Sequence, residues 1–87
     1  MTKIKCDNIN YRKGFVEVSG DIHKGCINLE AWNIHPDTDI SRDESVFGSV
    51  PDEAFTGNVE LELSVENAKE LARKLEELIA IAGNARR

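Results

Sequence analysis

A chain of 87 residues has room for one domain with a single core of two layers. Its 40% apolar and 31% charged residues are typical of a folded globular protein rather than a disordered chain. The net charge of −5, from 16 acidic and 11 basic residues, argues against a general nucleic-acid binder, which needs a positive surface to neutralise phosphates.

Three strands are predicted in the first part of the chain, at residues 3–11, 14–20 and 26–34. The turns between them, at residues 12–14 and 20–25, have hairpin lengths, so we expect an antiparallel meander. A fourth strand is predicted at residues 58–64, where "NVELELS" alternates between apolar and acidic residues. A β-bulge is expected near Asp7, because Ile9 and Tyr11 do not continue the alternation of Ile4 and Cys6.

The alternation also predicts two faces for this sheet. Phe15, Trp32 and Ile34 fall on one face, which needs a cover or a partner because three large apolar groups would otherwise face water. The other face is expected to pack on a helix, and Ile4 and Cys6 join it at the edge. Its remaining apolar members are Val16, Val18, Ile27, Leu29, Ala31, Val59, Leu61 and Leu63.

Residues 36–57 form a long acidic segment between the third and fourth strands. It has one base, Arg42, whereas the acids and bases of the rest of the chain cancel. Loops of this length are usually functional or disordered, and this one contains enough apolar residues to fold. We expect Phe47 and Phe55 to pin it to the sheet beside Trp32, as a flap whose carboxylates project outward. The carboxylates are Asp37, Asp39, Asp43, Glu44, Asp52 and Glu53.

A C-terminal helix is predicted over residues 65–82. Its apolar residues recur at the spacing of an amphipathic helix, Ser64 is a suitable N-cap, and Gly83 is placed to end it. Acidic and basic residues alternate on the other side of the helix, which is typical of a solvated, self-compensating face. The predicted fold is therefore α+β, a four-stranded antiparallel sheet with one C-terminal helix packed on one face as a second layer.

No catalytic motif is found, and we expect a protein that is not an enzyme and has no cofactor. A calcium loop starting at Asp37 would place Arg42 and Gly48 where glycine and glutamate are needed. Asp21, His23 and Cys26 are residue types that hold zinc, but their spacing matches no standard zinc site, so the simpler interpretation is a turn. Two cysteines and an N-terminus without an apolar run favour the cytoplasm.

The stretch "GNVELELSVENAKELARKLEELIAIA" resembles the C-terminal part of many small phage and prophage proteins. Together with the short length, the acidity and the acidic loop, it makes the chain similar to anti-CRISPR proteins, which are phage-encoded inhibitors. Several of these cover nucleic-acid-binding surfaces by presenting carboxylates. The resemblance implies a small sheet with one helix, and it assigns no functional residue.

The sequence thus favours a non-enzymatic binding protein whose partner is a protein with a basic nucleic-acid-binding surface, without direct nucleic-acid or membrane binding. The six loop carboxylates, with Phe47, Phe55 and Trp32, are the expected contacts. The alternative is a small homodimer that pairs its open sheet face through Phe15, Trp32 and Ile34. A small metal-dependent enzyme or metal protein that uses Asp21, His23 and Cys26 is a third hypothesis.

Overall fold

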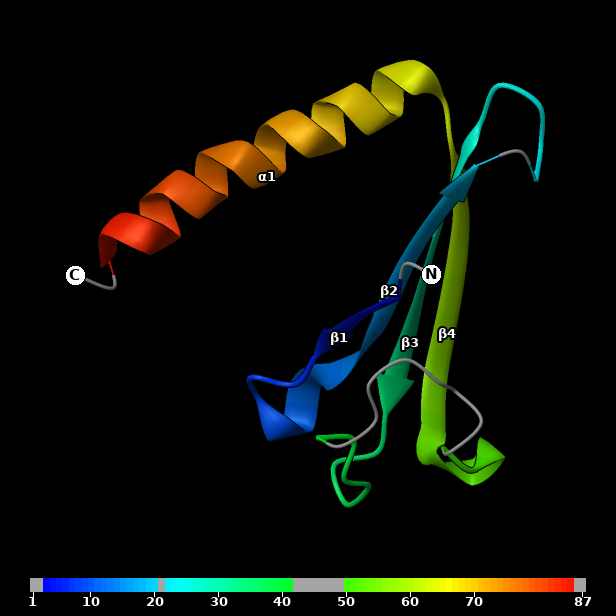
Figure 1. Ribbon diagram of the computed structural model, residues 1–87, viewed down its shortest axis with the longest axis vertical. Coiled ribbons are helices and arrows are strands. Elements are labelled where there is room, and N and C mark those ends of the chain that lie inside the picture. Colours follow the sequence, from blue (N-terminus) through cyan, green and yellow to red (C-terminus); the bar gives the residue numbers. More distant parts are fainter. Residues whose placement is uncertain (1–2, 21, 42–49, 86–87) are drawn as a thin grey trace.

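The computed structural model describes residues 3–20, 22–41 and 50–85, and it confirms the α+β class (Figure 1). Four antiparallel strands follow one another in chain order across a single sheet. The strands are β1 (Lys3–Cys6), β2 (Lys13–Gly20), β3 (Ile27–Ile34) and β4 (Phe55–Leu63), and the helix α1 (Val65–Ala85) follows directly. Two short 3₁₀ turns, η1 (Asn10–Arg12) and η3 (Asp52–Ala54), precede β2 and β4.

The core lies on the face of the sheet that carries Phe15 and Ile34, which are only 4% and 3% exposed. The segment between β3 and β4 folds onto this face and contributes Ile40, Val50 and Ala54, all buried. The flap expected from the sequence is therefore confirmed for the described part of that segment. The reason is that the segment carries apolar side chains at intervals, and the sheet offers it a large apolar surface that water would otherwise contact.

Polar contacts also hold this flap. The backbone N–H of His35 donates to the carbonyl of Ala54 at 2.7 Å, which ties the two ends of the flap together. The Lys5 ammonium on β1 donates to the carbonyl oxygens of Ile40 and Ser41 at 3.2 and 2.8 Å. The flap is thus joined to both sides of the sheet, and its buried carbonyl groups have partners.

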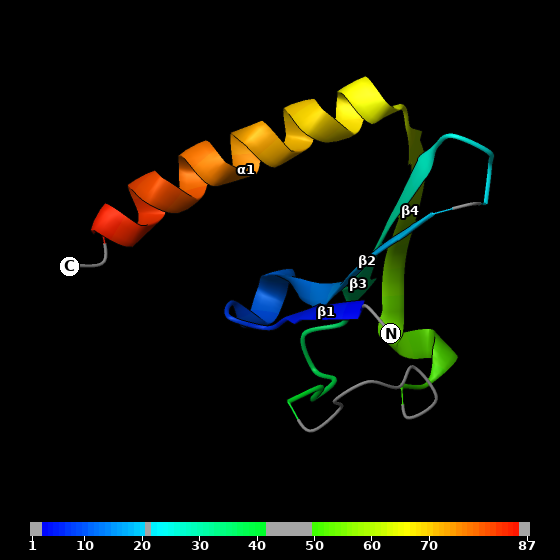
Figure 2. The same ribbon diagram turned by 45° about the horizontal axis from the view of Figure 1, so that its top comes forward.

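The predicted packing of the helix on the sheet is wrong. Helix α1 leaves the end of β4 and extends away from the sheet, at the end opposite to the flap (Figures 1 and 2). It contacts mainly β4, and Leu75 and Leu78 are 51% and 60% exposed. The sheet face that was expected to lie under the helix is therefore open, whereas the flap covers the other face, as expected.

Several element boundaries also differ from the sequence prediction. Strand β1 ends at Cys6, and the chain then turns through η1, so Tyr11 lies outside the sheet and is 74% exposed. The prediction of a β-bulge near Asp7 is wrong, because the strand ends before it, and the register shift of the described strands lies between Asn33 and Ile34, opposite the start of β4. Helix α1 continues through Gly83 to Ala85, since glycine in a helix is unfavourable by only about 1 kcal/mol.

Helix α1 begins with a reciprocal cap. The Ser64 hydroxyl accepts from the backbone N–H of Asn67 at 3.0 Å, and the Asn67 side chain accepts from the backbone N–H of Ser64 at 3.3 Å. On the polar side of the helix, Arg73 pairs with both Glu70 and Glu77, as expected for a self-compensating face. Within the described residues, no helix has the length and apolar character needed to cross a membrane.

Candidate functional site

The face of the sheet that carries Phe15 and Ile34, which we call the core face, also carries a group of glutamates. Glu17, Glu30 and Glu60 are register partners on β2, β3 and β4, so three glutamates stand side by side across three strands. Glu17 is two residues from Phe15 and Glu30 is two residues from Trp32, so both lie on the face of these aromatic residues. Glu60 pairs with Glu30 and therefore lies on the same face. Glu62 extends the row along β4. We call Glu17, Glu30, Glu60 and Glu62 the glutamate row.

Directly opposed like charges in neighbouring strands destabilise a sheet, because their Cβ atoms are only about 5 Å apart. Neighbouring groups relieve part of this repulsion. Lys3 Nζ lies 3.6 Å from a Glu17 oxygen, and the Asn58 side-chain amide donates to Glu30 at 3.0 Å. His23 Nδ1 lies 3.4 Å from a Glu62 oxygen. The Asn58 amide is uncharged, and Lys3 brings one positive charge against four carboxylates, so the row remains acidic.

Asn28 lies beside the glutamate row and adds another acceptor. It pairs in register with Glu62 and with Ser19, and it is only 3% exposed. Its side-chain oxygen is buried, and no group in the described part of the chain donates a hydrogen bond to it. A buried oxygen without a donor costs about 1–3 kcal/mol, so this position lowers the stability of the sheet.

The loop carboxylates that the structure describes lie on the flap, which packs on the core face of the sheet. Asp37, Asp39, Asp52 and Glu53 are all exposed, and the Asp37 side chain is 92% exposed. Asp39 Oδ1 accepts from the backbone N–H of Ser41 at 2.9 Å, which orders the turn without neutralising the charge. The expected contacts Asp43, Glu44 and Phe47 lie outside the described residues. The flap thus adds four outward carboxylates to the side of the molecule that carries the glutamate row.

The two described aromatic candidates pack against the core. Trp32 and Phe55 are half-buried and contact the cluster of Phe15, Ile34 and Ile40. The Lys3 ammonium lies 5.9 Å from the centre of the Trp32 ring, within cation–π range. Phe15 and Ile34 are covered by the flap, so the dimer predicted through Phe15, Trp32 and Ile34 has no accessible surface unless the flap leaves the sheet.

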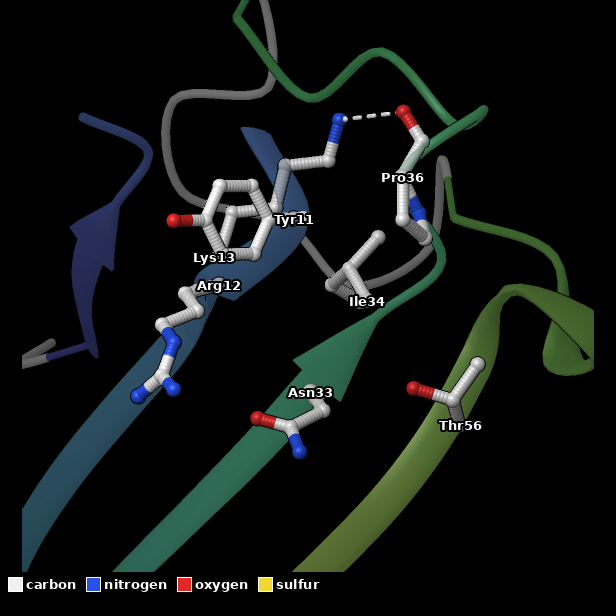
Figure 3. A pocket seen from close by; sticks show the side chains of 7 residues that line it. All are labelled: Tyr11, Arg12, Lys13, Asn33, Ile34, Pro36 and Thr56. Carbon is white, nitrogen blue, oxygen red and sulfur yellow. Dashed lines mark hydrogen bonds between the residues drawn. The ribbon is translucent and has the colours of Figure 1, made fainter. Parts of the chain in front are cut away.

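A polar hollow of about 420 Å³ opens where the flap meets the ends of β2, β3 and β4 (Figure 3). Lys13 lies at its edge and is 6% exposed, with its ammonium donating to the Asn10 side chain at 2.8 Å and to the Pro36 carbonyl at 3.1 Å. These two bonds hold the start of the flap on β2. The described lining contains no carboxylate, histidine or cysteine. Lys13 therefore has a structural role at this hollow, as the anchor of the start of the flap.

The zinc hypothesis rests on a hairpin that is described only in part. Asp21 lies outside the described residues, the His23 side chain is 69% exposed, and Cys26 is half-buried. The backbone N–H of Cys26 donates to the carbonyl of His23, and Gly25 takes a positive φ of 78°, which closes a tight turn. Among the described residues, no group of three potential ligands is placed to hold a metal ion.

The glutamate row is the part of this surface that sequence reasoning missed. Its signal was present, since the glutamates of "FVEVS", "NLEAW" and "VELEL" all point away from the valines and leucines. Comparison of the chain with protein-family models, with curated proteins and with solved structures finds no match.

Proposed function

We propose that this chain is a non-enzymatic binding protein of the cytoplasm that covers a basic, nucleic-acid-binding surface of a protein partner, as phage-type inhibitors of CRISPR-type complexes do. The observation that carries the proposal is the concentration of carboxylates on one side of the sheet. Four come from the glutamate row and four described ones from the flap. Such a surface repels nucleic acid and attracts the lysines and arginines that bind phosphates.

The sheet gives this surface a fixed geometry. Neighbouring strands are about 4.8 Å apart, and side chains two residues apart on one strand are separated by about 6.8 Å. The glutamate row therefore presents carboxylates at regular spacing on a rigid support, and no rotation of the backbone is needed on binding. This preorganisation lowers the entropy lost in forming the contact.

Repulsion between the carboxylates of the glutamate row lowers the stability of the free protein. Glu30 faces Glu17 on one side and Glu60 on the other, an arrangement that a partner's cations would convert from repulsion into attraction. A guanidinium suits such a row, since it brings five donors in a planar fork that carboxylates can accept. Trp32 and Phe55, half-buried between the two groups of acids, would supply the apolar part of the contact, together with Phe47.

The experiment is affinity capture from a lysate of the native host with three matched variants. In the first, the four glutamates of the row become glutamine. In the second, Asp37, Asp39, Asp52 and Glu53 become their amides. In the third, the control, the four helix glutamates Glu66, Glu70, Glu76 and Glu77 become glutamine. Each variant removes four negative charges, so only the position of the charge differs.

We expect wild type and the helix control to capture a nucleic-acid-handling complex, and the first two variants to capture at least about ten-fold less. Added DNA or RNA should release the captured complex, because it competes for the same basic surface, and retention should weaken steeply with salt. Equal capture by all four proteins would contradict the proposal, as would a complex that nucleic acid does not release.

A further inference from the structure

The face of the sheet opposite the flap is apolar and open. Its strand positions contain no charged residue, as the register and the alternation along each strand show. Ile4, Val18, Val59 and Leu61 on this face are 57%, 45%, 56% and 53% exposed. We call it the apolar sheet face; its members are Ile4, Cys6, Val16, Val18, Ile27, Leu29, Ala31, Val59, Leu61 and Leu63. A contiguous apolar surface across four strands needs a cover.

Helix α1 carries a second unpartnered apolar surface. Leu71, Leu75, Leu78 and Ile79, which we call the helix stripe, are 37%, 51%, 60% and 66% exposed. Their exposure increases along the chain because the helix moves away from the sheet as it proceeds (Figure 2). Burying an aliphatic side chain of this size is worth about 1.5–3 kcal/mol, so burial of the helix stripe against another apolar surface is strongly favourable.

The link between β4 and α1 is short, and the helix is capped at its first turn. A single residue, Ser64, separates Leu63 at the end of the strand from Val65 at the start of the helix. The reciprocal cap between Ser64 and Asn67 and the hydrogen bond from the Ala68 N–H to the Ser64 carbonyl at 2.9 Å hold the first turn of the helix. The helix is therefore formed from its first residue, and in this structure it extends away from its own sheet (Figure 1).

The chain exposes more surface than a compact monomer of the same mass. A monomeric protein of 9.7 kDa exposes about 5,100 Å², whereas this chain exposes 6791 Å². The radius of gyration is 14.7 Å, against about 12 Å for a compact chain of this length. The excess of about 1,700 Å² per copy corresponds to a total interface of about 3,400 Å², within the range of obligate homodimers.

The two apolar surfaces also match in length and charge. Helix α1, with 21 residues, is about 31 Å long, and β4, with 9 residues, is about 30 Å long. The sheet face is uncharged, and the helix balances its charges on the side away from the stripe, where Arg73 pairs with Glu70 and Glu77. No like-charge contact therefore opposes the meeting of helix stripe and sheet face.

We propose that two copies of this chain form a symmetric dimer in which α1 of each copy lies on the apolar sheet face of the other. A twofold axis makes the two helix–sheet contacts equivalent, so each copy gives and receives one helix. The second copy supplies the layer that the sheet lacks, which produces the two-layer packing that the sequence pattern predicts. The glutamate rows and flaps stay on the outside of both copies, so this inference does not depend on the proposed function.

The first test is the mass in solution, measured by light scattering at a fixed protein concentration. Wild type should have twice the mass of one 9.7 kDa chain. Leu78→Glu in the helix stripe and Val59→Glu on the sheet face should each weaken dimerisation by at least about thirty-fold. Lys69→Glu, on the helix side away from the stripe, is the control and should leave the mass unchanged. A monomeric wild type would overturn the proposal.

The second test mixes the two disrupted variants in equal amounts. In a mixed pair, the intact helix of Val59→Glu meets the intact sheet face of Leu78→Glu, so one of the two contacts is restored. The mixture should therefore contain dimers at a concentration at which each variant alone is monomeric. This recovery also shows that both variants are folded. A mixture that stays monomeric, or a Val59→Glu variant that dimerises like wild type through its helix alone, would refute the exchange of helices.

Discussion

Replacement of Ile40 by alanine tests most directly whether the acidic flap is part of the folded core. The Ile40 side chain is 1% exposed and lies in the flap, 35 residues along the chain from Lys5, which binds its carbonyl oxygen. The substitution removes three carbon groups at about 0.8 kcal/mol each, and the cavity that remains adds about 1 kcal/mol. We therefore expect the free energy of unfolding to fall by about 3 kcal/mol.

Urea unfolding followed by Trp32 fluorescence is the assay, because Trp32 is the only tryptophan and packs against this cluster. For a domain of this size, 3 kcal/mol lowers the melting temperature by about 12–24 °C. Ile9→Ala is the matched control: the same change is made at a side chain that is 48% exposed, and less than about 1 kcal/mol should be lost. Protein concentration must be held constant, since dimerisation would add to stability. Equal, small losses for both variants would refute the packing of the flap on the sheet.

Two further predictions concern the sheet. Gly14→Ala should destabilise the protein by more than about 2 kcal/mol in thermal unfolding, because the added Cβ would lie 1.8 Å from the Trp32 carbonyl oxygen. Gly20→Ala is the control and should be tolerated, since nothing lies within 4 Å of its added Cβ. Equal effects of the two substitutions would contradict the strand pairing. Glu60→Gln should raise the free energy of unfolding by roughly 0.5 kcal/mol at neutral pH, since it removes one like-charge contact from the glutamate row. Glu76→Gln on the helix should give no such gain, and a destabilised Glu60→Gln would mean that the row does not repel.

The local structure of this chain was readable from local signals. Alternation in "GFVEVSG" and "NVELELS" predicts strands because side chains on a pleated backbone point to opposite faces, and short turns between strands predict antiparallel neighbours. The helix was equally clear, from its apolar spacing and the Ser64 cap. These features depend on residues only a few positions apart, so the amino-acid sequence contains the whole signal.

Such local patterns could not predict whether the helix and the loop each cover a face of the sheet. Two segments compete for two sheet faces, and pattern alone places the amphipathic helix on the face of Val16 and Val59 and leaves the loop to cover the other. The flap does cover the face of Phe15 and Ile34, but the helix extends away from its own sheet (Figure 1), because its direction depends on the backbone at the single-residue link and not on the apolar pattern.

The glutamate row shows the same division. The sequence by itself determined that each of Glu17, Glu30 and Glu60 points away from its apolar neighbours, since that follows from alternation within one strand. Only the tertiary structure decided that the three stand in one line, because the alignment depends on the register between strands from distant parts of the chain. Charge counted along the chain hides this cluster, since the acids and bases outside residues 36–55 cancel in sum but not in space.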